Sequence, residues 1–128
     1  MKKILLASII GLMSITSSYA ACNGGIEISN TAGTTFCKSN VPMNWWSAAA
    51  WCKANSLRLA TMYEMCPNWD GSTGVGKCTE IDIGDSAYGD WTWSATASGN
   101  EYAFYVDPNS GTVKNDDYRD RKNYAICR

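Results

Sequence analysis

The pattern of apolar and polar residues changes several times along the chain, and the first segment stands apart from the rest. Lys2 and Lys3 precede an apolar segment at residues 4–15, and Ser18-Tyr19-Ala20 then places small residues at 18 and 20. A short positive head, a brief apolar segment and small residues are typical of a secretory signal peptide. We therefore expect residues 1–20 to be removed before Ala21. The segment is shorter than the ~20 residues that span a bilayer, so we expect no retained membrane span.

A helical period follows in the mature part. The apolar positions with spacing i, i+3, i+4 and i+7 are Trp45, Ala48, Ala49 and Cys52. One apolar face at this spacing predicts a helix over residues 45–53, with Asn44 as its cap and Asn55 as its end. Thr61 and Glu64 have the spacing of a capping box, and Pro67 follows soon after. They predict a second helix of one or two turns.

Period-two alternation marks the strands. Residues 21–40 form a short strand or hairpin closed by Cys22 and Cys37, and alternation at 91–96 and 102–106 predicts two further strands. Asp107-Pro108-Asn109-Ser110-Gly111 has turn residues in their usual places, so 112–113 should resume a hairpin, and 124–127 should be the final strand. Helices early and a sheet late indicate the α+β class.

Residues 68–90 form a glycine-rich, acidic stretch between the helices and the late strands. A loop this long in a small domain is usually functional or tied down, and Cys66 and Cys78 can tie its first half. Four carboxylates in this loop could hold a hard cation through oxygen, although a solvated acidic loop is the simpler interpretation. These residues are Glu80, Asp82, Asp85 and Asp90.

Cysteine usage indicates the compartment. All six cysteines lie in the mature part, and an even number in a short exported chain predicts three disulfides. A zinc site is the alternative, but the chain has no histidine and no Cys-x-x-Cys pair. Lipidation of Cys22 would be a second export route, and it would leave five cysteines. We expect a secreted or periplasmic protein.

Charge and composition exclude several functions. Because two of the eleven basic residues leave with the signal peptide, the mature domain has a net charge of −3. This balance disfavours nucleic acid and anionic membranes as partners. The chain has no histidine to act as a base and no Gly-x-Ser-x-Gly motif or phosphate loop. We therefore expect a non-enzymatic protein that needs no cofactor and no metal.

Three segments together resemble a known family. They are Trp45-x-x-Ala48-x-x-x-Cys52 with Leu59-Ala60-Thr61, Trp91-x-Trp93, and Asn115-Asp116 followed by Tyr124-Ala125-Ile126-Cys127-Arg128. In this order they are similar to the first helix, central strand and closing strand of C-type lectin-like domains. The resemblance covers most of residues 37–128. It implies a C-type lectin-like fold over 21–128, with two short helices and a small antiparallel sheet.

The resemblance also implies a covalent pattern. In that family the helix cysteine pairs with the cysteine of the last strand, which implies Cys52–Cys127 here. Cys22–Cys37 would close the amino-terminal hairpin, as in longer members of the family, and Cys66–Cys78 would be a local bond.

Two departures separate the chain from the sugar-binding members of the family. Asp107-Pro108-Asn109 resembles their calcium-binding tripeptide, but it lies too close to Asn115 and has the sequence of a hairpin turn. Arg119 stands where those members have a further cysteine. The resemblance is therefore to compact bacterial variants without the calcium and sugar site.

These observations predict calcium-independent recognition of a protein or glycan surface, as in an adhesin. Trp45 and Trp93 are expected in the core, whereas at least one of Trp46 and Trp51 should be partly exposed. The 68–90 loop and the 107–117 hairpin are the expected contact regions. The candidate binding residues are Trp69, Asp70, Asp85, Asp90, Trp91, Asn109, Asn115 and Asp116. An inhibitor of a periplasmic hydrolase and a subunit of a surface fibre are the alternatives.

Overall fold

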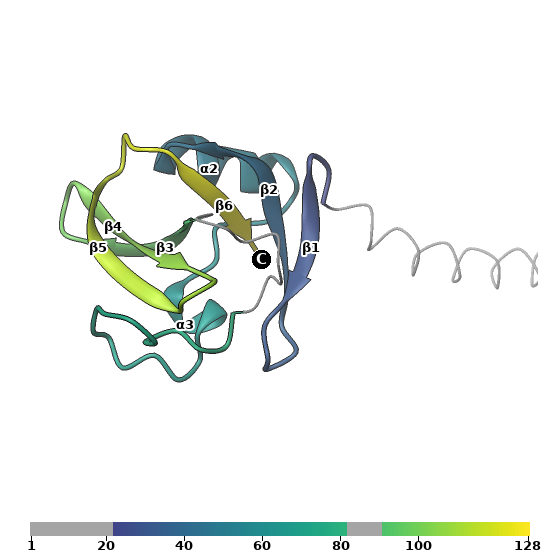
Figure 1. The fold of residues 1–128 in the computed structure, drawn as a ribbon. Coiled ribbons are helices and arrows are strands. Elements are labelled where there is room, and N and C mark those ends of the chain that lie inside the picture. Colours follow the sequence, from purple (N-terminus) through teal and green to yellow (C-terminus); the bar gives the residue numbers. More distant parts are fainter. Residues whose placement is uncertain (1–21, 82–90) are drawn as a thin grey trace, which may run out of the picture.

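One six-stranded sheet and two short helices make up the described part of the chain (Figure 1). The computed structural model describes residues 22–81 and 91–128. The predicted signal peptide and its cleavage site lie outside the described residues, as do Asp82, Asp85 and Asp90. The α+β class predicted from the sequence is confirmed.

The sheet places the last strand of the domain between its two halves. The strands are β1 (Gly25–Ser29), β2 (Thr35–Met43), β3 (Thr92–Ser98), β4 (Tyr102–Asp107), β5 (Thr112–Tyr118) and β6 (Asn123–Cys127). Their order is β1-β2-β6-β3-β4-β5, so the last strand lies in the middle of the sheet. Four neighbouring pairs are antiparallel, and β3 pairs with β6 in parallel through Thr92 and Tyr124.

This sheet differs from the small antiparallel sheet that we expected. It has six strands, and one pair is parallel. The reason is the position of β6, which pairs with β2 on one side and β3 on the other. Both helices and the long loop lie between β2 and β3 in the sequence. The connection from β2 to β3 is therefore a crossover and not a hairpin, and it places β3 on the other side of β6 from β2.

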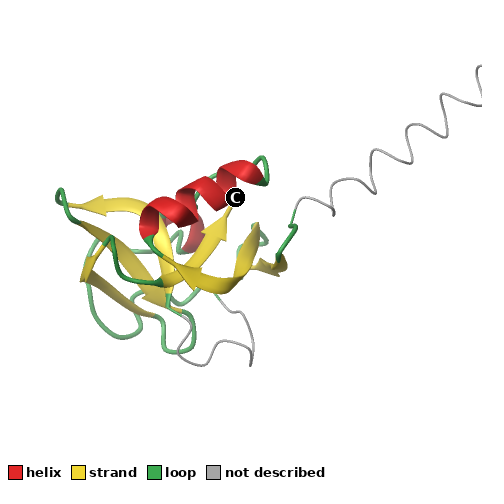
Figure 2. Cartoon of the chain, turned by 90° about the horizontal axis from the view of Figure 1, so that it is seen from above, coloured by secondary structure: helices red, strands yellow, loops and turns green. Residues whose placement is uncertain are grey.

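Helix α2 (Trp45–Ala54) forms where the sequence predicted it. The Asn44 side chain accepts a hydrogen bond from the Ser47 N–H at 2.8 Å and so caps the first turn. The backbone N–H of Asn55 bonds to carbonyls of the last turn and ends the helix. Ala48 and Cys52 are buried against the sheet, and Figure 2 shows α2 lying across one face of it.

Helix α3 (Met62–Met65) has the predicted capping box. The Thr61 hydroxyl accepts from the Glu64 N–H at 3.1 Å, and the Glu64 carboxylate accepts from the Thr61 N–H at 2.9 Å. Two of the helix's unpaired amide groups are thereby satisfied. Met62 and Met65 are completely buried, so this single turn is stabilised chiefly by its packing.

Apolar side chains cover both faces of the sheet. Alternation along β6 places Ala125 and Cys127 in the cluster beneath α2, and Ile126 in the cluster on the opposite face. Trp93 is fully buried in the α2 cluster, and its indole N–H donates to the Met43 carbonyl at 2.8 Å. Burying an aromatic side chain of this size stabilises the fold by roughly 3 kcal/mol.

The structure contains the three disulfides in the pairing that the family resemblance implied. They are Cys22–Cys37, Cys52–Cys127 and Cys66–Cys78. No cysteine of the described residues is free. Since Cys22 is bonded to Cys37, its sulfur is not available to carry a lipid. Three disulfides in a small domain are typical of an oxidising compartment.

No helix within the described ranges is long and apolar enough to cross a membrane.

Opening the Cys52–Cys127 bond should destabilise the domain more than opening the Cys66–Cys78 bond. The two bonds close sequence separations of 75 and 12 residues, and all four cysteines are buried. The chain-entropy model therefore predicts that C52A/C127A lowers the free energy of unfolding by about 1.5 kcal/mol more than C66A/C78A. Urea unfolding of both double variants measures the difference, and the reverse order would contradict it.

Acid should weaken the contact between Glu64 and Arg58. Hydrogen bonds from Arg58, at 2.6 Å between Nη1 and Oε1, lower the pKa of Glu64 to about 2, helped by the Thr61 N–H and opposed by burial. The stabilisation is complete above the unfolded pKa of about 4.3 and is lost as the pH falls towards 2. Because Arg58 is largely exposed and solvent screens its charge, we expect the contact to contribute about 1 to 2 kcal/mol to the free energy of unfolding.

The measurement compares the free energy of unfolding at pH 6 and at pH 2.5 for the unmodified protein and for Glu64→Gln. The variant cannot lose a carboxylate contact, so its stability should fall less over this range. Equal losses in both proteins would show that the pairing of Glu64 with Arg58 contributes nothing.

Candidate functional site

The loop after α3 is anchored by Trp69, one of the candidate binding residues. Its side chain is packed under the loop and is only 6% exposed. Its ring meets Phe104 edge-on at 4.9 Å and Tyr63 at 5.1 Å, and its indole N–H donates to the Ser72 carbonyl at 2.7 Å. The large apolar area of an indole is more stable beneath the loop than in water, once its N–H has a partner.

Glu80 closes the base of the same loop. Its buried carboxylate accepts hydrogen bonds from the backbone N–H groups of Asn68 and Thr79, both at 2.9 Å, and from the Thr79 hydroxyl at 3.1 Å. Glu80 was a candidate cation ligand, but its oxygens are used inside the fold. Among the described residues, no three His, Cys, Asp or Glu side chains are grouped as a metal site would require.

Asp70 is exposed at the tip of this loop. Hydrogen bonds from the Ser72 hydroxyl and N–H lower the pKa of Asp70 to about 2, and Lys77, with its Nζ 3.3 Å away, adds to the effect. The side chain therefore stays charged in neutral and mildly acidic solution. Its partner Trp69 is buried, so the structure does not bring the two predicted binding residues to a common surface.

The loop is bonded to the β4–β5 hairpin. Gly74 and Val113 exchange two backbone hydrogen bonds at 2.9 Å, and the Cys78 N–H donates to the Gly111 carbonyl at 3.0 Å. Gly111 has a φ of +68°, and a Cβ there would lie 2.5 Å from the Cys78 carbonyl oxygen. The predicted hairpin turn is confirmed. Asn109 is exposed at its tip, where its N–H donates to the Asp107 carboxylate.

Trp91 and Asp116 are brought together through Tyr105. The half-buried Trp91 ring lies 5.1 Å from the Tyr105 ring, and the Lys114 ammonium is 5.2 Å from the Trp91 centroid. The Tyr105 hydroxyl donates to Asp116 at 2.6 Å. Burial, followed by this carboxylate, raises the pKa of the Tyr105 hydroxyl well above its usual value. The neighbouring Asn115 is exposed on β5.

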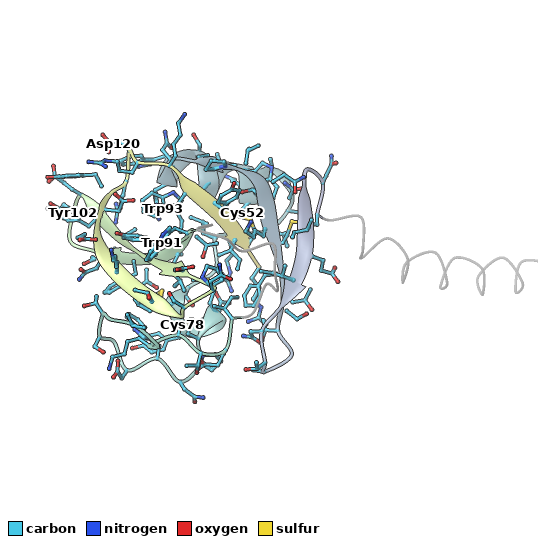
Figure 3. The ribbon with its side chains drawn as sticks, viewed as in Figure 1. Cys52, Cys78, Trp91, Trp93, Tyr102 and Asp120 are labelled. Atoms are coloured by element: carbon cyan, nitrogen blue, oxygen red, sulfur yellow. A yellow bond between two sulfur atoms is a disulfide. The ribbon has the colours of Figure 1, made fainter. Side chains whose placement is uncertain are left out.

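A second feature, which we call the aromatic hollow, lies where three chain segments meet. These are the start of α2, the β3–β4 turn and the β5–β6 turn. The hollow has a volume of about 240 Å³ and is lined by Trp46, Asn100, Glu101, Tyr118, Arg119 and Asp120. In Figure 3, Tyr102 and Asp120 mark this end of the molecule, away from Cys78.

Backbone hydrogen bonds fix the three segments of the aromatic hollow to one another. The Trp45 N–H donates to the Arg119 carbonyl at 2.8 Å, and the Arg119 N–H donates to the Glu101 carbonyl at 3.0 Å. Tyr118 stacks on Tyr102 across β4 and β5, with ring centroids 4.9 Å apart. The hollow is therefore formed by the fold itself, before any ligand binds.

Aromatic rings also hold the charged side chain of the hollow. The Arg119 guanidinium carbon lies 4.6 Å from the centroid of Trp45, a cation–π distance. Its buried Nε has no hydrogen-bond acceptor among the described residues. Trp45 in turn meets Trp46 edge-on at 6.1 Å. Trp46 is 55% exposed and Tyr118 is 44% exposed, so both rings face solvent.

The sequence predicted part of this arrangement. The expectation that at least one of Trp46 and Trp51 is partly exposed is confirmed by Trp46. In the sequence Arg119 is distinguished only by standing where the sugar-binding members of the family have a cysteine, and Tyr118 has no distinguishing pattern. The segments that carry Trp46 and Tyr118 are far apart in the sequence, so their meeting depends on β2, β6 and β5 taking their places in the sheet.

The chemistry of the aromatic hollow suits binding. It combines exposed rings with two carboxylates, one amide and one guanidinium. Trp, Tyr and Arg are the residues that most often contribute large binding energies at interfaces. Of the other predicted residues, Trp91 and Asp116 both contact Tyr105 outside the hollow, and Asn115 is exposed on β5. Asp85 and Asp90 lie outside the described residues.

Removing the Glu80 carboxylate should destabilise the loop. Glu80→Ala leaves two backbone N–H groups and one hydroxyl without their acceptor, which should cost about 1 to 3 kcal/mol. Glu80→Gln keeps one carbonyl oxygen as an acceptor and should therefore lose less stability than Glu80→Ala. Urea unfolding measures both, with Glu27→Ala as the exposed control. If Glu80→Ala were no less stable than the control, the carboxylate would have no role in closing the loop.

No family model matches the chain, and a search of the curated proteins finds no match. Functional assignment therefore rests on the side chains described above.

Proposed function

We propose that the exported domain is a non-enzymatic binding module that recognises a protein or glycan surface without calcium, as an adhesin does. The observation that carries this proposal is the aromatic hollow. Its two exposed rings, Trp46 and Tyr118, stand beside charged and amide side chains on three segments that backbone hydrogen bonds hold together. The proposed contact region is thus the end of the domain that contains the α2 N-terminus, rather than the described part of the loop, residues 68–81.

Preorganisation supports this choice of surface. Ordering side chains on binding costs about 0.5 to 1.5 kcal/mol for each flexible side chain. The Arg119 guanidinium is already held over Trp45, and Tyr118 is already stacked on Tyr102. A ligand at the aromatic hollow would therefore lose little of its interaction energy to ordering these groups.

The C-type lectin-like fold is part of the same proposal. It is supported by the disulfide that joins α2 to the last strand, Cys52–Cys127, and by the position of that strand beside β2. The six-stranded sheet with its parallel β3–β6 pair is larger than the sheet that the family resemblance implied.

Independence from calcium is supported by how the carboxylates of the hairpin are used. In the tripeptide that resembles a calcium site, Asp107 accepts from the Asn109 N–H and from the Ser110 hydroxyl within its own turn. The absence of histidine from the chain supports a non-enzymatic role, because the commonest general base is missing.

The proposal predicts binding that is unaffected by calcium. The exported protein, labelled and applied to a glycan array and to an array of cell-surface proteins, should bind equally in calcium and in EGTA. Its melting temperature should also be equal in both. If calcium did bind the folded protein, calcium at 100 times its Kd would stabilise the fold by about 2.7 kcal/mol and raise the melting temperature.

Three other results would count against this function. A melting temperature raised by calcium would show a calcium site. Slowing of a hydrolase panel at micromolar concentration, without binding to either array, would favour an inhibitor. Assembly into large oligomers on a sizing column, again without binding, would favour a fibre subunit.

A further inference from the structure

We infer that the aromatic hollow binds a single neutral sugar ring, such as one hexopyranose unit of a glycan. This inference rests on the proposed binding function and specifies the ligand class and the residues that contact it. It does not involve the hairpin Asp107-Pro108-Asn109, which lies at the other end of β4 and β5 from the hollow.

The size of the aromatic hollow suits a small ligand. Its volume of about 240 Å³ is below the 300–1,000 Å³ of pockets that enclose drug-sized ligands. Asn100, Glu101 and Asp120 are exposed at its rim, so the hollow is open to solvent. One ring of a longer chain can enter while its neighbours remain outside.

The exposed rings match the amphipathic shape of a sugar. A pyranose ring has faces that carry C–H groups and an edge that carries hydroxyl groups. Trp46 and Tyr118 present flat apolar surfaces against which a C–H face can pack, and such rings lose little conformational entropy on binding. Trp46 is packed edge-on against Trp45, and Tyr118 is packed against Tyr102.

The charges of the aromatic hollow favour a neutral, hydroxyl-bearing ligand. Glu101 and Asp120 accept hydrogen bonds, Arg119 donates them, and the amide of Asn100 can do both. Two carboxylates disfavour an anionic ligand, and the guanidinium offsets part of their attraction for a cationic one. Neighbouring hydroxyl groups, each both donor and acceptor, can bond to acidic and basic partners at once.

Arg119 is the positioning element of this site. Its backbone N–H and carbonyl bond to the β3–β4 turn and to the start of α2, respectively. Its guanidinium rests on Trp45, and among the described residues it makes no ion pair that would hold its N–H groups. Its donors are therefore directed by ring packing and can bond to a sugar oxygen.

The test is a titration of the exported protein with single sugars, followed by NMR of the indole N–H signals. Glucose, galactose, mannose and N-acetylglucosamine are the neutral probes, with glucuronate as the anionic probe and choline as the cationic probe. We expect at least one neutral sugar to shift the Trp46 signal, with a Kd of about 1 mM for a single ring. Both charged probes should bind more weakly.

Variants locate the site. Trp46→Ala and Tyr118→Ala should each weaken sugar binding about tenfold, which corresponds to about 1.4 kcal/mol. Tyr63→Ala is the matched control, because Tyr63 is as exposed as Trp46, at 56%, but lies on α3 outside the hollow. This control should bind as the unmodified protein does. Thermal unfolding confirms that all three variants fold.

Different failures have different meanings. If no neutral sugar shifts the Trp46 signal, or if a charged probe binds more tightly, the sugar assignment is wrong. A protein ligand found on the array and lost in Trp46→Ala would still support the binding function at the aromatic hollow. If sugars bind but Trp46→Ala and Tyr118→Ala bind them as well as Tyr63→Ala does, the location is wrong and the binding function stands.

Discussion

The attachment of helix α2 to strand β6 is the constraint on which the rest of the structure depends. The Cys52–Cys127 disulfide joins the two across 75 residues, and β6 pairs with β2 and β3 in the middle of the sheet. Opening this link would release both the helix and the strand that unites the two halves of the sheet. The bond holds α2 against β6, and the hydrogen bond from the Trp45 N–H to the Arg119 carbonyl joins the start of the helix to the β5–β6 turn.

Covering both faces of the sheet determines where function can lie. Helix α2 covers one face, while α3 and the 68–81 segment cover the other, with Trp69 inserted beneath the loop and Glu80 bonded across its base. The indole of Trp69 is thereby removed from the surface that this loop offers to a partner. Two exposed aromatic rings, Trp46 and Tyr118, lie at the end of the sheet, where the turns meet α2.

The aromatic hollow illustrates how a binding surface can be rigid although it is built mostly from turns. Turns alone are mobile, but here each turn is held by an element already fixed in the core. Arg119 is bonded to Glu101 and Trp45 through its backbone, and Tyr118 rests on Tyr102. The same contacts that stabilise the β3–β4 and β5–β6 turns therefore hold the rings and charges that a ligand would meet.

Local features of the chain were determined by the sequence alone. Asn44, the Thr61–Glu64 capping box, the alternation at 102–106 and the Asp107–Gly111 turn each depend on residues a few positions apart, and each forms as predicted. The place of β6 within the sheet, the burial of Trp69 and the meeting of Trp46 with Tyr118 were decided by the tertiary structure. These depend on contacts between distant segments, whose energies are shared among many partners and leave no periodic mark in the sequence.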